Sequence, residues 1–114
     1  MAFVLKRSGS YSWPVNFDVP VDGGRHERQT FDCEFKHLSQ SRIQEITDGI
    51  GADELTPLEV ASEVLVGWSG VTDDDGKEVP FSQKSMAELL EVPMLAGAIV
   101  MAYFDSLNGA KRKN

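Results

Sequence analysis

The chain has 114 residues, of which 41% are hydrophobic, enough to close one core. Its formal net charge of −7 argues against binding to nucleic acid, whose phosphates attract basic proteins, and against docking on an anionic membrane. We therefore expect a single domain over residues 1–114, with an acidic exterior that suits basic protein partners.

One cysteine, Cys33, cannot form an internal disulfide, which fits a reducing cytoplasm. The first residues, MAFVLKRSGS, lack a long apolar run that ends in a small-residue cleavage site, so we expect no signal peptide. The longest apolar run, residues 94–104, is much shorter than the roughly 20 residues of a membrane-spanning helix. It predicts a buried core helix instead.

Residues 1–37 predict an antiparallel β-hairpin or small sheet. A short apolar run covers residues 2–6, and apolar and polar residues then alternate over 13–20 and again over 30–36. A period of two is typical of strands with one buried face. The turn signal Asp22-Gly23-Gly24 between the two alternating runs indicates that they pair as a hairpin.

The two expected strands differ in their surroundings. Pro14 and Pro20 cannot donate hydrogen bonds to a neighbouring strand, so the first strand is expected at a sheet edge. In the second strand, Cys33 shares the apolar side with Phe31 and Phe35, which is typical of an unreactive core cysteine.

Residues 38–109 predict four helices, which makes the expected fold class α+β. The expected spans run from Ser39 to Gly51, from Thr56 to Trp68, from Ser82 to Leu90 and from Pro93 to Gly109. In the second, Thr56, Pro57 and Glu59 have the spacing of a capping box with proline in the first helical position. The fourth is apolar nearly all round and is expected to be the most enclosed element. The basic tail, residues 110–114, has nothing to bury and is expected to be mobile.

The segment GWSGVTDDDGKEVPFS, residues 67–82, combines a tryptophan, three aspartates and a glycine turn. An EF-hand calcium loop needs a glycine in the sixth place and a glutamate in the twelfth. Counted from Asp73, glycine is fourth and the twelfth place holds Lys84, so the spacing fails. We therefore expect no metal site, and instead a polar turn whose aspartates accept local backbone hydrogen bonds.

Other chemistry is weakly supported. Three neighbouring aspartates in one exposed turn share one environment, whereas acid–base catalysis needs two different ones. Cys33 and His37 could form a nucleophile–base pair, but the cysteine is expected in the core. Phosphate-binding loops, dinucleotide-binding loops and zinc motifs do not occur in the sequence. We expect no catalytic, cofactor or metal residues, and hence a protein that is not an enzyme.

Binding to another protein remains. Trp68, Phe81 and Tyr103 are the large side chains that could anchor a partner, although ordinary core packing explains each of them as well. The pairs Gly67-Trp68 and Pro80-Phe81 are expected to clamp the acidic loop between them.

The pattern Gly67-Trp68-x-Gly70-Val71, followed by an acidic turn with Gly76 and by Val79-Pro80-Phe81-Ser82, resembles the tail assembly chaperones of long, non-contractile-tailed bacteriophages and prophages. The resemblance implies a protein in the cytoplasm of the bacterial host that binds the tape measure protein, keeps it soluble and assists tail tube assembly, without remaining in the mature virion. It also implies self-association, and a longer frameshifted form that recruits the tail tube protein.

The partner-binding residues expected on this basis lie in the 67–82 segment and the last helix: Trp68, Val71, Asp73, Asp74, Phe81 and Tyr103. The competing interpretation is a structural phage protein, either a minor tail or a tail-completion protein, which would stay in the particle.

Overall fold

The computed structural model describes residues 2–5 and 9–109, and within them it confirms an α+β arrangement. In chain order the elements are β1 (Ser10–Val21), β2 (Arg25–Lys36), α1 (Gln40–Gly51), α2 (Pro57–Val64), β3 (Leu65–Ser69), α3 (Gln83–Leu89) and α4 (Leu95–Asn108). The expected mobile tail, residues 110–114, lies outside the described residues.

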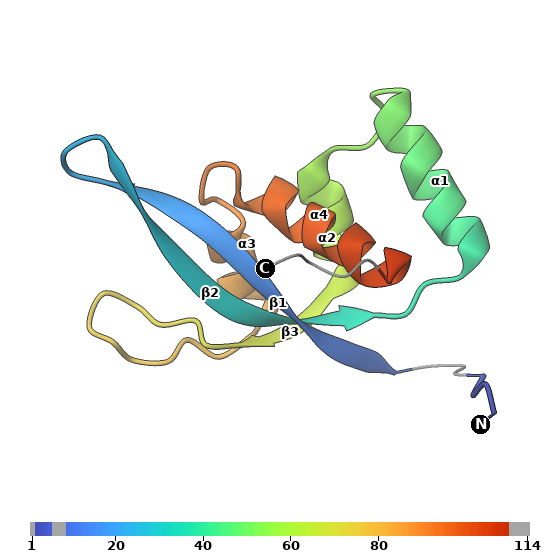
Figure 1. Cartoon of the computed structure of the whole chain (residues 1–114), viewed down its shortest axis with the longest axis horizontal. Coiled ribbons are helices and arrows are strands. Elements are labelled where there is room, and N and C mark those ends of the chain that lie inside the picture. The colour runs from blue at the N-terminus through green and yellow to red at the C-terminus, as the bar shows by residue number, and fades with distance from the viewer. Residues whose placement is uncertain (1, 6–8, 110–114) are drawn as a thin grey trace.

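The three strands form one antiparallel sheet in the order β1-β2-β3. β1 and β2 pair over their whole length through the turn at 22–24, which confirms the hairpin, although each strand is longer than the alternating run that predicted it. β3 pairs only with residues 32–35 of β2. The far half of the hairpin therefore extends beyond the three-stranded part, and its turn lies away from the helices (Figure 1).

β1 is an edge strand, as its prolines predicted. Pro14 pairs with Asp32 and Pro20 with His26. The two prolines belong to the same alternate series of the strand, and a residue without an N–H is accommodated where that group would face away from the partner strand. The open side of β1 thus lacks a hydrogen-bond donor at both positions.

One expectation was wrong in the middle of the chain. The helix that begins at Pro57 ends at Val64, and Leu65–Ser69 is a strand. Leu65 and Trp68 continue the helical spacing, but Leu65 and Gly67 are buried while Val66 between them is exposed, which is the period of a strand. Hydrogen bonding to β2 decides the outcome. Without β3, the backbone N–H and C=O groups of β2 residues 32–35 that face it would lack partners.

The first three helices begin directly after the residues at which the sequence placed their starts. The side chains of Ser39, Thr56 and Ser82 each accept a backbone N–H of the first turn. Thr56 and Glu59 form the predicted capping box. α4 begins two residues after Pro93, at Leu95, and ends at Gly109 with φ 63°.

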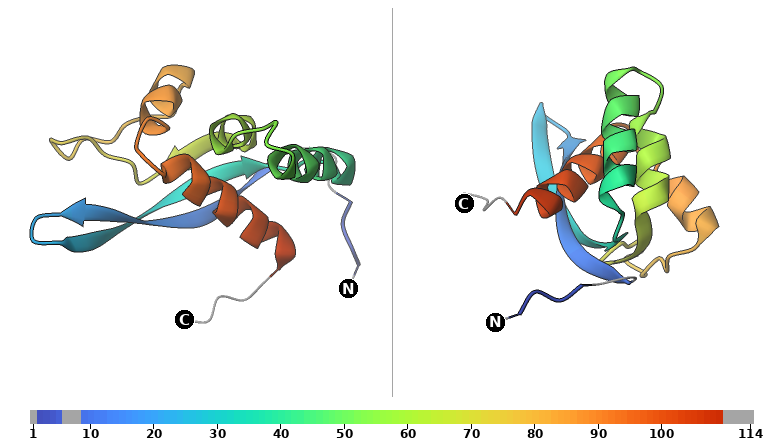
Figure 2. Two further views of the ribbon diagram at one scale, coloured as in Figure 1. Left: turned by 90° about the horizontal axis from the view of Figure 1, so that it is seen from above. Right: turned by 90° about the vertical axis from the view of Figure 1, so that its right-hand side faces the viewer.

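The core lies between the apolar face of the sheet and the helices, and α4 packs on both β1 and α2 (Figure 2). The Tyr103 ring meets Phe35 edge-on at 5.1 Å, and its hydroxyl donates to the Lys36 carbonyl at 3.2 Å. The buried apolar residues are Val15, Cys33, Phe35, Ile46, Val60, Ala61, Val64, Leu65, Met86, Leu90, Leu95, Ile99, Val100 and Tyr103.

Two apolar segments are less enclosed than the sequence predicted. Residues 2–5, the described part of the apolar run over 2–6, have no regular structure, and Phe3 is 92% exposed. α4 is buried on one side through Ile99 and Tyr103, but Met101 on its other side is 69% exposed. Among the described residues, β1 and α2 make the main contacts with this helix, so a sequence that is apolar nearly all round leaves one apolar face open.

Candidate functional site

The acidic loop between β3 and α3 is held by its own backbone and one aspartate. Asp73 Oδ1 accepts the N–H groups of Asp75 and Lys77 at 2.9 and 3.0 Å, and the Asp73 N–H donates to the Lys77 carbonyl. Gly76 takes φ 80°, a conformation that residues with a Cβ adopt rarely. The loop is therefore the locally bonded turn that the sequence predicted.

The side chains at the two ends of the loop fix it to the body. Trp68 Nε1 donates to the Val79 carbonyl at 2.7 Å, and the Trp68 ring meets Phe81 edge-on at 5.0 Å. Ser85 Oγ donates to the Pro80 carbonyl at 2.8 Å and also accepts the Ser82 N–H. These contacts make the loop a fixed projection, which extends from the same side of the molecule as the hairpin turn (Figures 1 and 2).

The six residues proposed from the sequence do not form one surface. Asp73 and Asp74 are exposed, and Val71 is half-buried. Trp68 and Phe81 are half-buried against each other. Tyr103 is fully buried, so in the folded chain it is a core residue and offers no surface to a partner.

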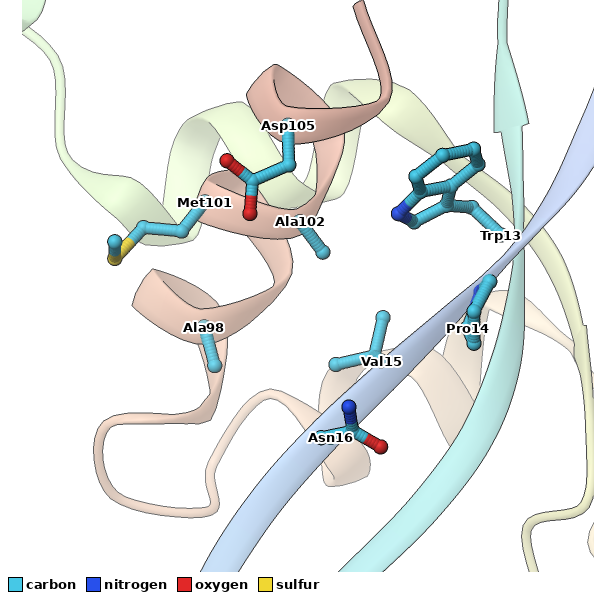
Figure 3. Close-up of a pocket in the computed structure, with 8 residues that line it drawn as sticks. All are labelled: Trp13, Pro14, Val15, Asn16, Ala98, Met101, Ala102 and Asp105. Carbon is cyan, nitrogen blue, oxygen red and sulfur yellow. The ribbon is translucent and has the colours of Figure 1, made fainter. Parts of the chain in front are cut away.

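A first groove lies between β1 and the open face of α4 (Figure 3). We call it the β1–α4 groove. It has a volume of about 270 Å³, and its lining residues are Trp13, Pro14, Val15, Asn16, Ala98, Met101, Ala102 and Asp105. The helix contributes two alanines, a methionine and Asp105, so its side of the groove is shallow and adaptable and carries one carboxylate.

A second groove lies between the far half of the hairpin, the start of the acidic loop and the turn before α4. We call it the hairpin groove. It has a volume of about 260 Å³, and its lining residues are Phe17, Val19, Gln29, Thr30, Phe31, Gly70, Val71, Thr72, Leu89, Val92 and Leu95. Val71 is the one predicted site residue that lines either of these grooves.

Sequence reasoning missed most of both grooves. The alternation over 13–19 shows which strand residues face the helices, but it does not show that β3 stops short of Phe17 and Phe31. The exposure of Met101 could have been predicted from the sequence. It lies in a helix that is apolar nearly all round, in a chain with few other elements to cover it.

The Cys33–His37 pair has the features of structural residues. Cys33 is completely buried, and burial, together with the nearby charge of Asp32, raises the pKa of its thiol to about 12. His37 is exposed after the end of β2, with its ring 4.9 Å from that of Tyr11. A thiol with so high a pKa supplies almost no thiolate at neutral pH.

The described residues also contain neither a metal-binding cluster nor a membrane-spanning helix. No cluster of three or more His, Cys, Asp or Glu side chains suited to a metal occurs among residues 2–5 and 9–109. Within the same residues, no helix combines the length and the apolar character needed to cross a membrane.

Fold and surface together define a small α+β protein with an internally fixed acidic loop and two open, largely apolar grooves. The model of the YdaY prophage protein family matches residues 34–102, about three fifths of the chain, and the chain belongs to this family. The match runs from the end of β2 into α4, so it includes the acidic loop, whereas β1 lies outside it. Neither the curated proteins nor the solved structures gave a match. The expectation of a prophage protein is confirmed at the level of the family.

Proposed function

We propose that this prophage protein is a tail assembly chaperone that holds an apolar helical segment of the tape measure protein and keeps it soluble in the host cytoplasm until the tail tube covers it. The observation that carries the proposal is the open apolar face of α4 beside β1, in a chain with a strongly acidic body. The choice of the tape measure protein as the client rests on the resemblance of residues 67–82 to such chaperones.

The β1–α4 groove suits a helix better than a small ligand. A Cβ built on Gly97 of α4 meets no atom within 4 Å, so the space above the helix is open there. With Ala98 and Ala102 in the groove lining, a second helix can approach the α4 backbone closely. Met101 is flexible and can adapt to differing apolar side chains, as methionines do on surfaces that bind many sequences.

The charge of the body favours a client whose apolar face is flanked by basic residues. All 18 acidic residues lie between residues 9 and 109, where only six basic residues accompany them, a formal net charge of −12. Such a field steers basic segments towards the protein and keeps the loaded complex soluble. In this proposal the acidic loop contributes charge through Asp74, while Asp73 serves mainly to hold the loop.

The test is co-expression with the tape measure protein from the same prophage genome. We expect the tape measure protein to move into the soluble fraction and to co-purify with the chaperone. Met101→Glu, which puts a charge on the groove without disturbing a buried residue, should reduce the soluble amount by roughly tenfold. Leu58→Glu is the matched control, because Leu58 is 46% exposed and lines none of the grooves described.

Two results would contradict the proposal. One is a tape measure protein whose solubility does not change on co-expression. The other is an intact polypeptide in purified phage particles, detected by mass spectrometry in amounts comparable with tail proteins, which would instead favour the minor tail or tail-completion interpretation. Recruitment of the tail tube protein through a longer frameshifted form remains part of the proposal and is tested by sequencing the gene beyond the codon for Asn114.

A further inference from the structure

The chain carries an exposed apolar arm, residues 2–5, at the end of the molecule opposite its hairpin groove. Phe3 is 92%, Val4 69% and Leu5 66% exposed, the largest run of exposed apolar side chains in the described residues. In Figure 1 and in the left-hand view of Figure 2, residues 2–5 and the hairpin turn lie at opposite ends of the molecule. Three consecutive apolar side chains in water are costly unless something covers them.

We propose that the arm, Ala2–Leu5, docks in the hairpin groove of a second copy of this chain. The inference concerns self-association and does not depend on the client proposed above. Three observations support it: the arm fits the groove in shape, its basic flank suits the acidic surroundings of the groove, and the arm is too short to reach the groove of its own chain.

The shape match follows from the geometry of an extended chain. In an extended segment Phe3 and Leu5 point to the same side, about 7 Å apart. The hairpin groove has a volume of about 260 Å³, enough for two such side chains, and its lining is mainly apolar, with Phe17, Phe31 and Leu95 among its residues. The polar residues of the lining are Gln29, Thr30 and Thr72, and no charged residue lines the groove.

The charge match concerns the arm and the body. The arm contains no acidic residue and is followed in the sequence by Lys6 and Arg7, whereas residues 9–109 carry a formal net charge of −12. Carboxylates adjoin the groove lining in sequence: Asp73 follows Thr72, and Glu91 precedes Val92. An apolar segment with a basic flank is therefore complementary to the surroundings of this groove.

The reach of the chain disfavours docking within one molecule. Phe3 lies six residues before Gly9, so its Cα reaches at most about 22 Å from that of Gly9. Phe17 lies eight residues after Gly9 along β1, about 26 Å away in an extended strand. Val19 is further still, so the groove is filled by the arm of another copy. Reciprocal exchange in a two-fold dimer lets each copy cover the arm of the other.

The dimer is expected to be weak. Three side chains on each arm bury far less than the about 1,600 Å² of a standard interface, so association should depend on concentration. Sedimentation velocity over a concentration series should show wild type approaching about twice 12.6 kDa. The double variant Phe3→Ser with Leu5→Ser changes only exposed side chains, and its dissociation constant should rise at least roughly tenfold. Leu58→Ser, an exposed apolar change elsewhere, should leave the dissociation constant unchanged.

A second measurement locates the docking site. The isotope-labelled Phe3→Ser, Leu5→Ser variant is titrated with a synthetic peptide of residues 1–9, and amide shifts are followed by NMR. Shifts at Val19, Val71 and Val92 are expected. Shifts confined to Met101 and its neighbours, no shifts, or a wild-type chain that stays monomeric with its arm amides protected would each overturn the proposal. A dimer of wild type that the arm variant retains would overturn it as well.

Discussion

The contact between the end of α1 and the loop that follows it gives the sharpest test of the packing. Gly49 is buried in α1, and a Cβ built on it would lie 2.7 Å from Leu55 Cδ1 and 2.9 Å from Leu55 Cγ. The Gly49 carbonyl also accepts the N–H groups of Glu54 and Leu55, at 2.7 and 3.1 Å. Because these bonds hold the backbone of Leu55 beside Gly49, its side chain can relieve the close contact only by leaving its present rotamer.

Gly49→Ala should therefore destabilise the protein, although helix propensity alone predicts the reverse. Alanine in place of glycine stabilises a helix interior by roughly 0.5–1 kcal/mol. Overpacking a tight contact costs roughly 1–3 kcal/mol, which outweighs that gain and leaves a net loss of about 1 kcal/mol. Gly51→Ala is the matched control: it is in the same helix, no atom lies within 4 Å of its built Cβ, and it should be neutral or slightly stabilising.

Urea unfolding followed by far-UV circular dichroism measures both variants. The double variant Gly49→Ala, Leu55→Ala completes the cycle, since truncation leaves only the Cβ of residue 55, at 3.4 Å, within ordinary contact distance. The Gly49→Ala change should then cost about 1 kcal/mol less than in wild type. A Gly49→Ala protein at least as stable as Gly51→Ala would refute the reasoning.

Three further predictions concern the core and its edge. Cys33 should resist alkylation in the folded protein and react once unfolded, because its thiol pKa is raised to about 12; rapid native labelling would contradict this. Glu63→Gln should lower the urea midpoint slightly at neutral pH, since Arg42 donates to both carboxylate oxygens, at 2.6 and 2.8 Å. The hydrogen bonds from Arg42 hold the pKa of Glu63 below its ordinary value, so this stability is present above that value and is lost as pH falls through the lowered pKa. Urea midpoints of wild type and variant should accordingly converge in acid, and a gap that persists there would argue against the ion pair. Tyr103→Phe should cost about 1 kcal/mol for the bond to Lys36, and Tyr103→Ala roughly 3–5 kcal/mol for the ring; equal losses by calorimetry would show that the hydroxyl dominates.

Local signals in the sequence predicted the elements well. A cap such as Ser39 or Thr56 acts on the amides of the next turn, so its chemistry is complete within four residues. The alternation of apolar and polar residues in β1 and β2 is also a local pattern, and the short turn between the two strands determines that they pair with each other. β3 was missed because its strand character depends on hydrogen bonds to β2, about 30 residues earlier, and its apolar spacing also suits a helix.

The candidate surface was harder to predict. The acidic loop could be interpreted from its sequence because Asp73 bonds within its own turn. The β1–α4 groove places Asn16 near Ala98, residues that no local pattern connects. Tyr103 was an ambiguous anchor in the sequence, and only packing against Phe35 assigns it to the core.

The two prolines of β1 have a consequence for how the protein behaves when it is concentrated. A sheet with a continuous row of free amides on its last strand can serve as a template for cross-β stacking and fibril growth. Pro14 and Pro20 interrupt that row. The molecule can therefore display apolar grooves to other chains while the β1 edge of its sheet is protected from cross-β stacking.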